Sequence, residues 1–191
     1  MKHVPNILTV IRLFLIPVYL LFFYSNINNS VYWALAVFVF ASITDIADGF
    51  IARKYNAESK IGQLLDPLAD KLMQLTALFT LSFAGYIKMW VFWFFLGKEV
   101  LMIISGVVLY LSKVKIIIPS NIFGKLTTIL VYIAIVLSVF ESLIFDLEIS
   151  EHLFVIVIIF ALITFIQYGY IGIKKLLTYR SKTDEEVKEE I

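Results

Sequence analysis

Apolar residues fall into six long runs along this 191-residue chain, separated by short polar or charged breaks. A helix needs roughly 20 apolar residues to cross the hydrocarbon core of a bilayer, and runs of that length recur here. The pattern predicts helices over 7–25, 31–53, 61–85, 88–111, 118–144 and 151–173. We therefore expect an all-α fold, a polytopic integral membrane bundle of six helices.

The composition supports lipid as the solvent for this bundle. Apolar residues make up 61% of the chain, and the mean hydropathy is +0.92. Soluble domains contain closer to half apolar residues. The length leaves no room for a separate soluble domain, so we expect a transmembrane domain over 1–181 and a charged tail over 182–191. The chain has no cysteine, which excludes disulfides and thiolate-bound metals.

The distribution of lysine and arginine predicts the orientation, because cytoplasmic loops collect these residues. The cations on one side are Lys2, Arg12, Arg53, Lys54, Lys60, Lys113, Lys115, Lys174, Lys175 and Arg180. The other side holds an uncharged turn, Lys88 and an acidic turn. We expect a multi-pass protein of the cell membrane with both termini in the cytoplasm. Residues 3–12 are expected to lie along the membrane surface.

Four aspartates stand where the second predicted helix ends and the third begins: Asp45, Asp48, Asp66 and Asp70. The first two are three residues apart and the last two are four apart, so each pair shares one helix face. A connection of about eight residues makes the two helices antiparallel neighbours. Both pairs are therefore expected to converge near the cytoplasmic side.

Carboxylates brought together at low dielectric repel one another unless cations neutralise them. Ligands that are all oxygen suit Mg²⁺ or Mn²⁺, and two such ions form a clamp for phosphoryl chemistry. One alternative is a set of structural salt bridges with Arg53, Lys54 or Lys71. Another is a cation transporter, although the far halves of the helices carry no matching acidic relay and no internal repeat is evident.

The order and spacing of these residues resemble the complete signature of the CDP-alcohol phosphatidyltransferase family: Asp45-x₂-Asp48-Gly49-x₂-Ala52-Arg53-x₈-Gly62-x₃-Asp66-x₃-Asp70. The resemblance implies a six-helix membrane enzyme whose polar pocket opens to the cytoplasm. It would transfer a phosphatidyl group from CDP-diacylglycerol to a small alcohol. It further implies that Asp45, Asp48 and Asp66 bind metal, and that Asp70 binds metal and acts as the general base.

The resemblance also implies which residues bind the CDP-lipid. Gly49 and Arg53 would contact the CDP moiety, with Ser59 as a further candidate. The opening Pro5-Asn6-x₂-Thr9-x₂-Arg12 is similar to that of many members and adds Asn6 and Thr9. Family members suggest a homodimer. No stacking pattern for nucleic acid is present.

The acceptor alcohol is predicted from the opening segment, which is most similar to members that use glycerol 3-phosphate. An anionic acceptor needs cationic contacts, for which Lys98 and Lys125 are the candidates. Alternatively, Lys98 is the ion-pair partner of Glu99, and Lys125 reaches the lipid headgroups. A second arginine of the glycerophosphate-using members is absent from 105–107, and 97–101 is also similar to members that make cardiolipin from phosphatidylglycerol.

Overall fold

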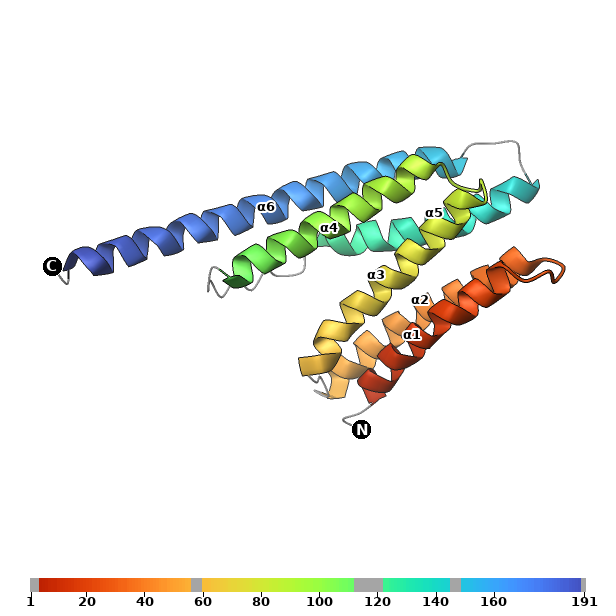
Figure 1. Cartoon of the computed structure of the whole chain (residues 1–191), viewed down its shortest axis with the longest axis horizontal. Coiled ribbons are helices and arrows are strands. Elements are labelled where there is room, and N and C mark those ends of the chain that lie inside the picture. The colour runs from red at the N-terminus through yellow and green to blue at the C-terminus, as the bar shows by residue number, and fades with distance from the viewer. Residues whose placement is uncertain (1–3, 56–59, 112–121, 145–148, 190–191) are drawn as a thin grey trace. The chain divides into compact units, whose positions relative to one another are not determined.

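The computed structural model describes the chain except for 1–3, 56–59, 112–121, 145–148 and 190–191, and it describes side chains over 10–44, 65, 67–108, 123–141, 149–172 and 174. The described residues form helices and contain no strand, which confirms the all-α class. The helices are α1 (Val4–Phe23), α2 (Ser30–Tyr55), α3 (Lys60–Phe83), α4 (Met89–Leu111), α5 (Ile122–Ile144) and α6 (Ile149–Glu189) (Figure 1).

Most predicted helix ends agree with the structure to within four residues, but the end of the last helix is wrong. α6 continues to Glu189, far beyond the predicted end at 173. No glycine or proline follows Gly172, and the residues after it are rich in lysine, glutamate and leucine, which favour helix. Leaving an apolar stretch does not by itself end a helix. The predicted start of the fifth helix at 118 lies outside the described residues.

The end of α3 is fixed by a glycine in the left-handed conformation. Gly85 has φ of 85°. Its N–H donates to the carbonyl of Ser82 at 3.2 Å, and the N–H of Tyr86 donates to the carbonyl of Leu81 at 2.9 Å. This pair of bonds is a Schellman motif, which satisfies the last carbonyls of a helix and favours glycine at this position. The break that the sequence predicted at Gly85 is therefore a defined helix stop.

The chain divides into two compact units. The first contains 1–93 and 132–151, and the second contains 94–131 and 152–191. In the first unit α1 packs against both α2 and α3 (Figure 1). A hydrogen bond of 2.7 Å joins the buried Tyr19 hydroxyl of α1 to Thr80 of α3. Buried alanines such as Ala34 and Ala77 let the helices approach closely.

In the second unit α5 packs closely on α6. A Cβ atom added at Gly124 would lie 3.3 Å from the hydroxyl oxygen of Tyr168 and 3.5 Å from a methyl carbon of Thr164. Nearby, the rings of Phe123 and Phe160 lie 6.3 Å apart between centroids. The absence of a side chain at Gly124 therefore permits the close approach of the two helices.

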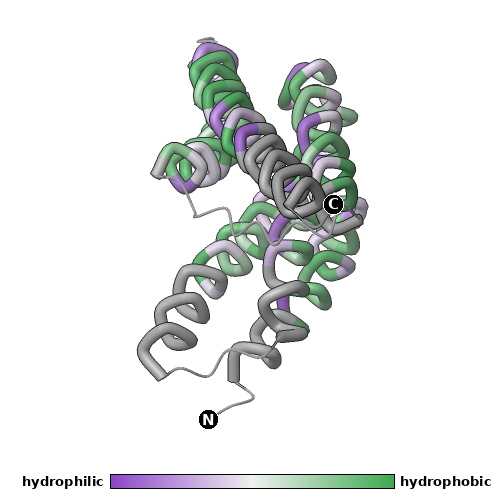
Figure 2. The backbone as a smooth tube through the Cα atoms, turned by 90° about the vertical axis from the view of Figure 1, so that its left-hand side faces the viewer, coloured by the Kyte–Doolittle hydropathy of each residue, from purple (hydrophilic) through white to green (hydrophobic). Residues whose placement is uncertain are grey.

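Three helices are long and apolar enough to cross a membrane, among the residues described. They are Met89–Val108, Phe123–Glu141 and Ile149–Gly172, with mean hydropathies of 1.9, 2.1 and 2.5. Val10–Phe23 and Ser30–Thr44 are shorter apolar helices. Figure 2 shows apolar residues along most of the described helices. Large apolar side chains face outward, including Leu21 at 72% exposure and Ile166 at 67%, as expected of a protein surrounded by lipid.

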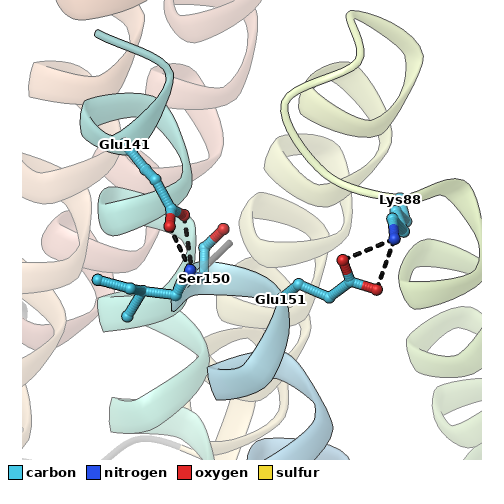
Figure 3. A network of polar contacts seen from close by, with 5 residues as sticks. Lys88, Glu141, Ser150 and Glu151 are labelled. Carbon is cyan, nitrogen blue, oxygen red and sulfur yellow. Dashed lines mark hydrogen bonds and ion pairs between the residues drawn. The ribbon is translucent and has the colours of Figure 1, made fainter. Parts of the chain in front are cut away.

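Polar contacts connect the beginnings and ends of three helices. The carboxylate of Glu141, near the end of α5, accepts hydrogen bonds from the backbone N–H groups of Ile149 and, at 2.9 Å, Ser150 (Figure 3). These are the first two residues of α6, whose N–H groups have no partner within the helix. Lys88, just before α4, forms an ion pair of 2.6 Å with Glu151. Glu141 therefore caps α6 from a neighbouring helix.

Glu141→Ala is expected to lower the free energy of unfolding by about 0.5–2 kcal/mol, the usual cost of losing a helix cap. Thermal unfolding of the purified protein in detergent, followed by circular dichroism, measures the effect. Lys88→Ala is the matched control, because it removes the ion pair with Glu151, whose lysine side chain is 57% exposed, and leaves the cap in place. Such pairs contribute about 0–1 kcal/mol. A larger loss for Lys88→Ala than for Glu141→Ala would contradict the capping role.

Candidate active site

The four signature aspartates lie on the two helices predicted for them. Asp45 and Asp48 belong to the last part of α2, and Asp66 and Asp70 to the first half of α3. Both pairs therefore have the helical spacing that puts each pair on one face. The side chains of Asp45, Asp48 and Asp66 are not among those described. Their convergence into one site stays a prediction.

Asp70 is the signature aspartate whose surroundings are described. Its half-buried carboxylate accepts a hydrogen bond at Oδ1 from the hydroxyl of Tyr132 on α5. The ring of Tyr132 lies edge-on against Phe38 of α2, with centroids 5.3 Å apart and planes at 79°. All three residues belong to the first unit. Asp70 is thus contacted by Tyr132 of α5, whose ring is in turn contacted by Phe38 of α2.

A polar face continues along α3 beyond Asp70. Gln74 lies one helical turn further and is only 2% exposed, and its buried Oε1 has no hydrogen-bond partner among the described residues. Buried polar atoms without a hydrogen-bond partner are uncommon in proteins. The residues at 66, 70 and 74 follow the spacing of one helix face. Gln74 is not among the residues predicted for the site from the sequence.

Arg12 of α1 is buried, with 1% of its surface exposed. Arg12 lies well inside a helix packed on α2 and α3, and the expectation that residues 3–12 lie along the membrane surface stays a prediction. Tyr19 of α1 and Thr80 of α3 are hydrogen-bonded to each other. Arg12 precedes Tyr19 on α1 by about two helical turns, and Met73 precedes Thr80 on α3 by the same distance. Arg12 thus lies near the level of Gln74. Burial of a guanidinium is costly unless polar groups surround it.

The predicted donor set fits Mg²⁺ or Mn²⁺ by its chemistry, because every member is a carboxylate. The hydrogen bond from Tyr132 engages Oδ1 of Asp70. A carboxylate has lone pairs on both oxygens, so Oδ2 could bind a cation. Among the side chains that the structure describes, no group of three or more His, Cys, Asp or Glu residues is close enough to hold a metal. Three of the four predicted ligands, Asp45, Asp48 and Asp66, have side chains that are not among those described.

The two lysines predicted for the acceptor belong to the second unit. Lys98 of α4 is largely buried and forms an ion pair of 2.7 Å with Glu99. Its ammonium nitrogen lies 5.9 Å from the ring centroid of Phe95. Lys125, beside Gly124 on α5, is exposed. The ion pair given as the alternative for Lys98 is present, and the role of either lysine towards an acceptor stays a prediction.

The remaining candidates lie where side chains are not described. Asn6 and Thr9 are on α1, and Gly49 and Arg53 are on α2. Ser59 lies outside the described residues altogether. Their contacts with a CDP-lipid therefore stay predictions.

Comparison with known proteins identifies the family. The profile of the CDP-alcohol phosphatidyltransferase family matches residues 2–167. A CDP-diacylglycerol–glycerol-3-phosphate 3-phosphatidyltransferase of Rickettsia typhi is 39% identical over 144 residues, covering 74% of this chain and 79% of that protein. The protein of the same name from Aquifex aeolicus is 31% identical over 180 residues, covering 91% of this chain and 98% of its own.

A shorter match is to a protein of Mycobacterium bovis named "Putative cardiolipin synthase". It is 41% identical over 87 residues, or 46% of this chain and 41% of that protein. The family profile spans the opening segment, all four aspartates and both lysines discussed above. It is a family of enzymes, which decides against the transporter alternative. The chain belongs to the CDP-alcohol phosphatidyltransferase family.

Proposed function

We propose that this enzyme transfers the phosphatidyl group of CDP-diacylglycerol to glycerol 3-phosphate, forming phosphatidylglycerophosphate and releasing CMP. The observation that carries the proposal is the complete aspartate signature in a chain whose relatives of that name match it over most of its length. The apolar helices agree with a reaction whose lipid substrate and product stay in a membrane.

The proposed reaction is a single displacement at phosphorus. The acceptor hydroxyl attacks the β-phosphorus of the CDP-lipid, a new phosphorus–oxygen bond forms, and the bond to the CMP oxygen breaks. Asp70 takes the proton that the attacking hydroxyl loses. Two bound Mg²⁺ or Mn²⁺ ions would supply charge stabilisation for the pyrophosphate. Asp45, Asp48, Asp66 and Asp70 would hold them, and Gly49, Arg53, Ser59, Asn6 and Thr9 would bind the CDP-lipid.

The proposed setting is a six-helix multi-pass bundle with both termini in the cytoplasm and an active-site pocket open to that side. The distribution of lysine and arginine supports this orientation. A cytoplasmic pocket would let the water-soluble cytidine and acceptor reach the aspartates while the acyl chains remain in the bilayer. We also propose a homodimer, on the resemblance to the family.

The acceptor is tested directly with purified protein in mixed micelles that contain CDP-diacylglycerol and Mg²⁺. Glycerol 3-phosphate and phosphatidylglycerol are supplied in separate reactions, and products are identified by mass spectrometry. Phosphatidylglycerophosphate from the first reaction supports the proposal. Cardiolipin from the second, with no product from the first, would establish the alternative that 97–101 and the shorter match favour.

Lys98→Ala is expected to raise the KM for glycerol 3-phosphate by about tenfold to a hundredfold, while the KM for the CDP-lipid changes little. A hydrogen bond to a charged group contributes about 1.5–3 kcal/mol, which corresponds to this range. Steady-state kinetics with each substrate varied in turn measures both constants.

Glu99→Gln is the matched control for Lys98→Ala, because it weakens the same 2.7 Å ion pair from the other side. If Lys98 serves only as the partner of Glu99, both variants should lose thermal stability to a similar extent without a selective change in the KM for glycerol 3-phosphate. That result would remove Lys98 from the acceptor site.

A further inference from the structure

We infer that Tyr132 is a positioning residue for the reaction: its hydroxyl holds the carboxylate of Asp70 in the orientation that the site requires. The inference rests on the role proposed above for Asp70. Tyr132 lies on α5, far from the signature in sequence, and neither the signature nor the family resemblance assigns it a function.

The contact has two parts, which together fix where the hydroxyl lies. The phenolic O–H donates to Oδ1 of Asp70. The ring is held edge-on by Phe38, at 5.3 Å between centroids. A tyrosine side chain has only two rotatable angles that place its ring, so one ring contact leaves the hydroxyl little freedom. Helices α2 and α5 thus place a donor against a carboxylate that belongs to α3.

A hydrogen bond at one oxygen of a carboxylate restricts where the other one points. With Oδ1 bonded to Tyr132, rotations of the Asp70 side chain that carry Oδ1 away break the hydrogen bond, so Oδ2 is restricted to a smaller range of directions. Residues that orient metal ligands in this way commonly change metal affinity or activity by about 10–100-fold when they are removed. The same orientation serves proton transfer, which requires hydrogen-bond geometry between base and hydroxyl.

A second buried hydroxyl provides a matched control. Tyr19 donates to or accepts from Thr80 at 2.7 Å, and it is also buried against an aromatic neighbour, Phe23, whose ring centroid is 5.9 Å away. Thr80 lies ten residues after Asp70 on α3, about 15 Å along the helix. Tyr19→Phe therefore removes a comparable hydrogen bond between helices of the same unit without touching an aspartate.

The experiment compares Tyr132→Phe with Tyr19→Phe. Three quantities are measured for each variant: kcat with saturating substrates, Mn²⁺ affinity by titration calorimetry without substrate, and the midpoint of thermal unfolding. Tyr132→Phe is expected to lower kcat by about 10–100-fold and to weaken Mn²⁺ binding by about tenfold. Tyr19→Phe is expected to lower the unfolding midpoint while leaving kcat and Mn²⁺ affinity near wild type.

Two results would overturn the inference. One is wild-type kcat and Mn²⁺ affinity in Tyr132→Phe, and the other is an equal loss of both in Tyr19→Phe. The Mn²⁺ titration separates this inference from the proposed function. If the wild-type enzyme makes no phosphatidylglycerophosphate, the proposed acceptor is wrong, but an Mn²⁺ affinity that falls only in Tyr132→Phe still supports the positioning role.

Discussion

Asp70→Asn is expected to lower kcat by about 10²–10⁴-fold, the usual cost of removing a general base. Asparagine keeps the size of the side chain and an oxygen that can accept the hydrogen bond from Tyr132. It removes the carboxylate that can take a proton from the acceptor hydroxyl. Binding of CDP-diacylglycerol in the presence of metal should survive in part, because three carboxylates remain in the predicted set. Steady-state kinetics and calorimetric binding measure the two effects.

Asp45→Asn distinguishes the role of a ligand from that of a base. Asp45 is expected to bind metal only, so its replacement should weaken metal and CDP-lipid binding together, and activity should recover partly at high metal concentration. Asp70→Asn should not recover in this way. An Asp70→Asn enzyme that turns over near the wild-type rate would show that another group accepts the proton.

Exhaustive chelation is expected to reduce activity by about 10³-fold or more, with recovery on addition of Mg²⁺ or Mn²⁺. A bound metal supplies several kcal/mol of stabilisation to a phosphoryl transition state, which corresponds to a loss of this size. The four carboxylates, converging as predicted, would also repel one another without a neutralising cation. Product formation in metal-free buffer, followed by titration with each ion, measures the dependence.

Thermal unfolding provides the control for chelation. A metal that binds the folded site raises the unfolding midpoint, whereas one that acts only on the substrate in solution does not. We expect Mg²⁺ and Mn²⁺ to stabilise the wild-type protein without substrate and to stabilise Asp45→Asn less. Full activity after chelation, with an unchanged midpoint on adding metal, would exclude the two-metal mechanism.

The helices were largely predictable because their signal is local. A run of apolar residues that ends at Gly85, or at an Asn-rich turn, is read directly from the sequence, and the Schellman motif at Gly85 explains why that reading succeeded. The end of α6 was not predictable in the same way. The apolar stretch of α6 reaches Gly172, and no glycine or proline follows that would break the helix. The end of the apolar stretch and the end of the helix therefore fall at different residues.

From the sequence, only those features of the site could be predicted that depend on the spacing of residues along one helix. The positions of Asp66 and Asp70 on α3 follow from their spacing, but the bond from Tyr132 joins residues 62 apart in sequence. Tyr132 is one of ten tyrosines in the chain, and nothing local marks it. The burial of Arg12 was likewise missed, because a positive charge near a membrane is normally read as a surface residue.

Because α6 is continuous, a tilt of its apolar part would move its polar end. Its apolar part ends at Gly172, and the helix then continues without a break to Glu189. At 1.5 Å per residue this extension is about 25 Å long. A tilt of about 10° in the apolar part would therefore displace the far end by roughly 4 Å, because a helix without glycine or proline transmits rotation along its length. The polar end of α6 would therefore move farther than the apolar part when the helix tilts.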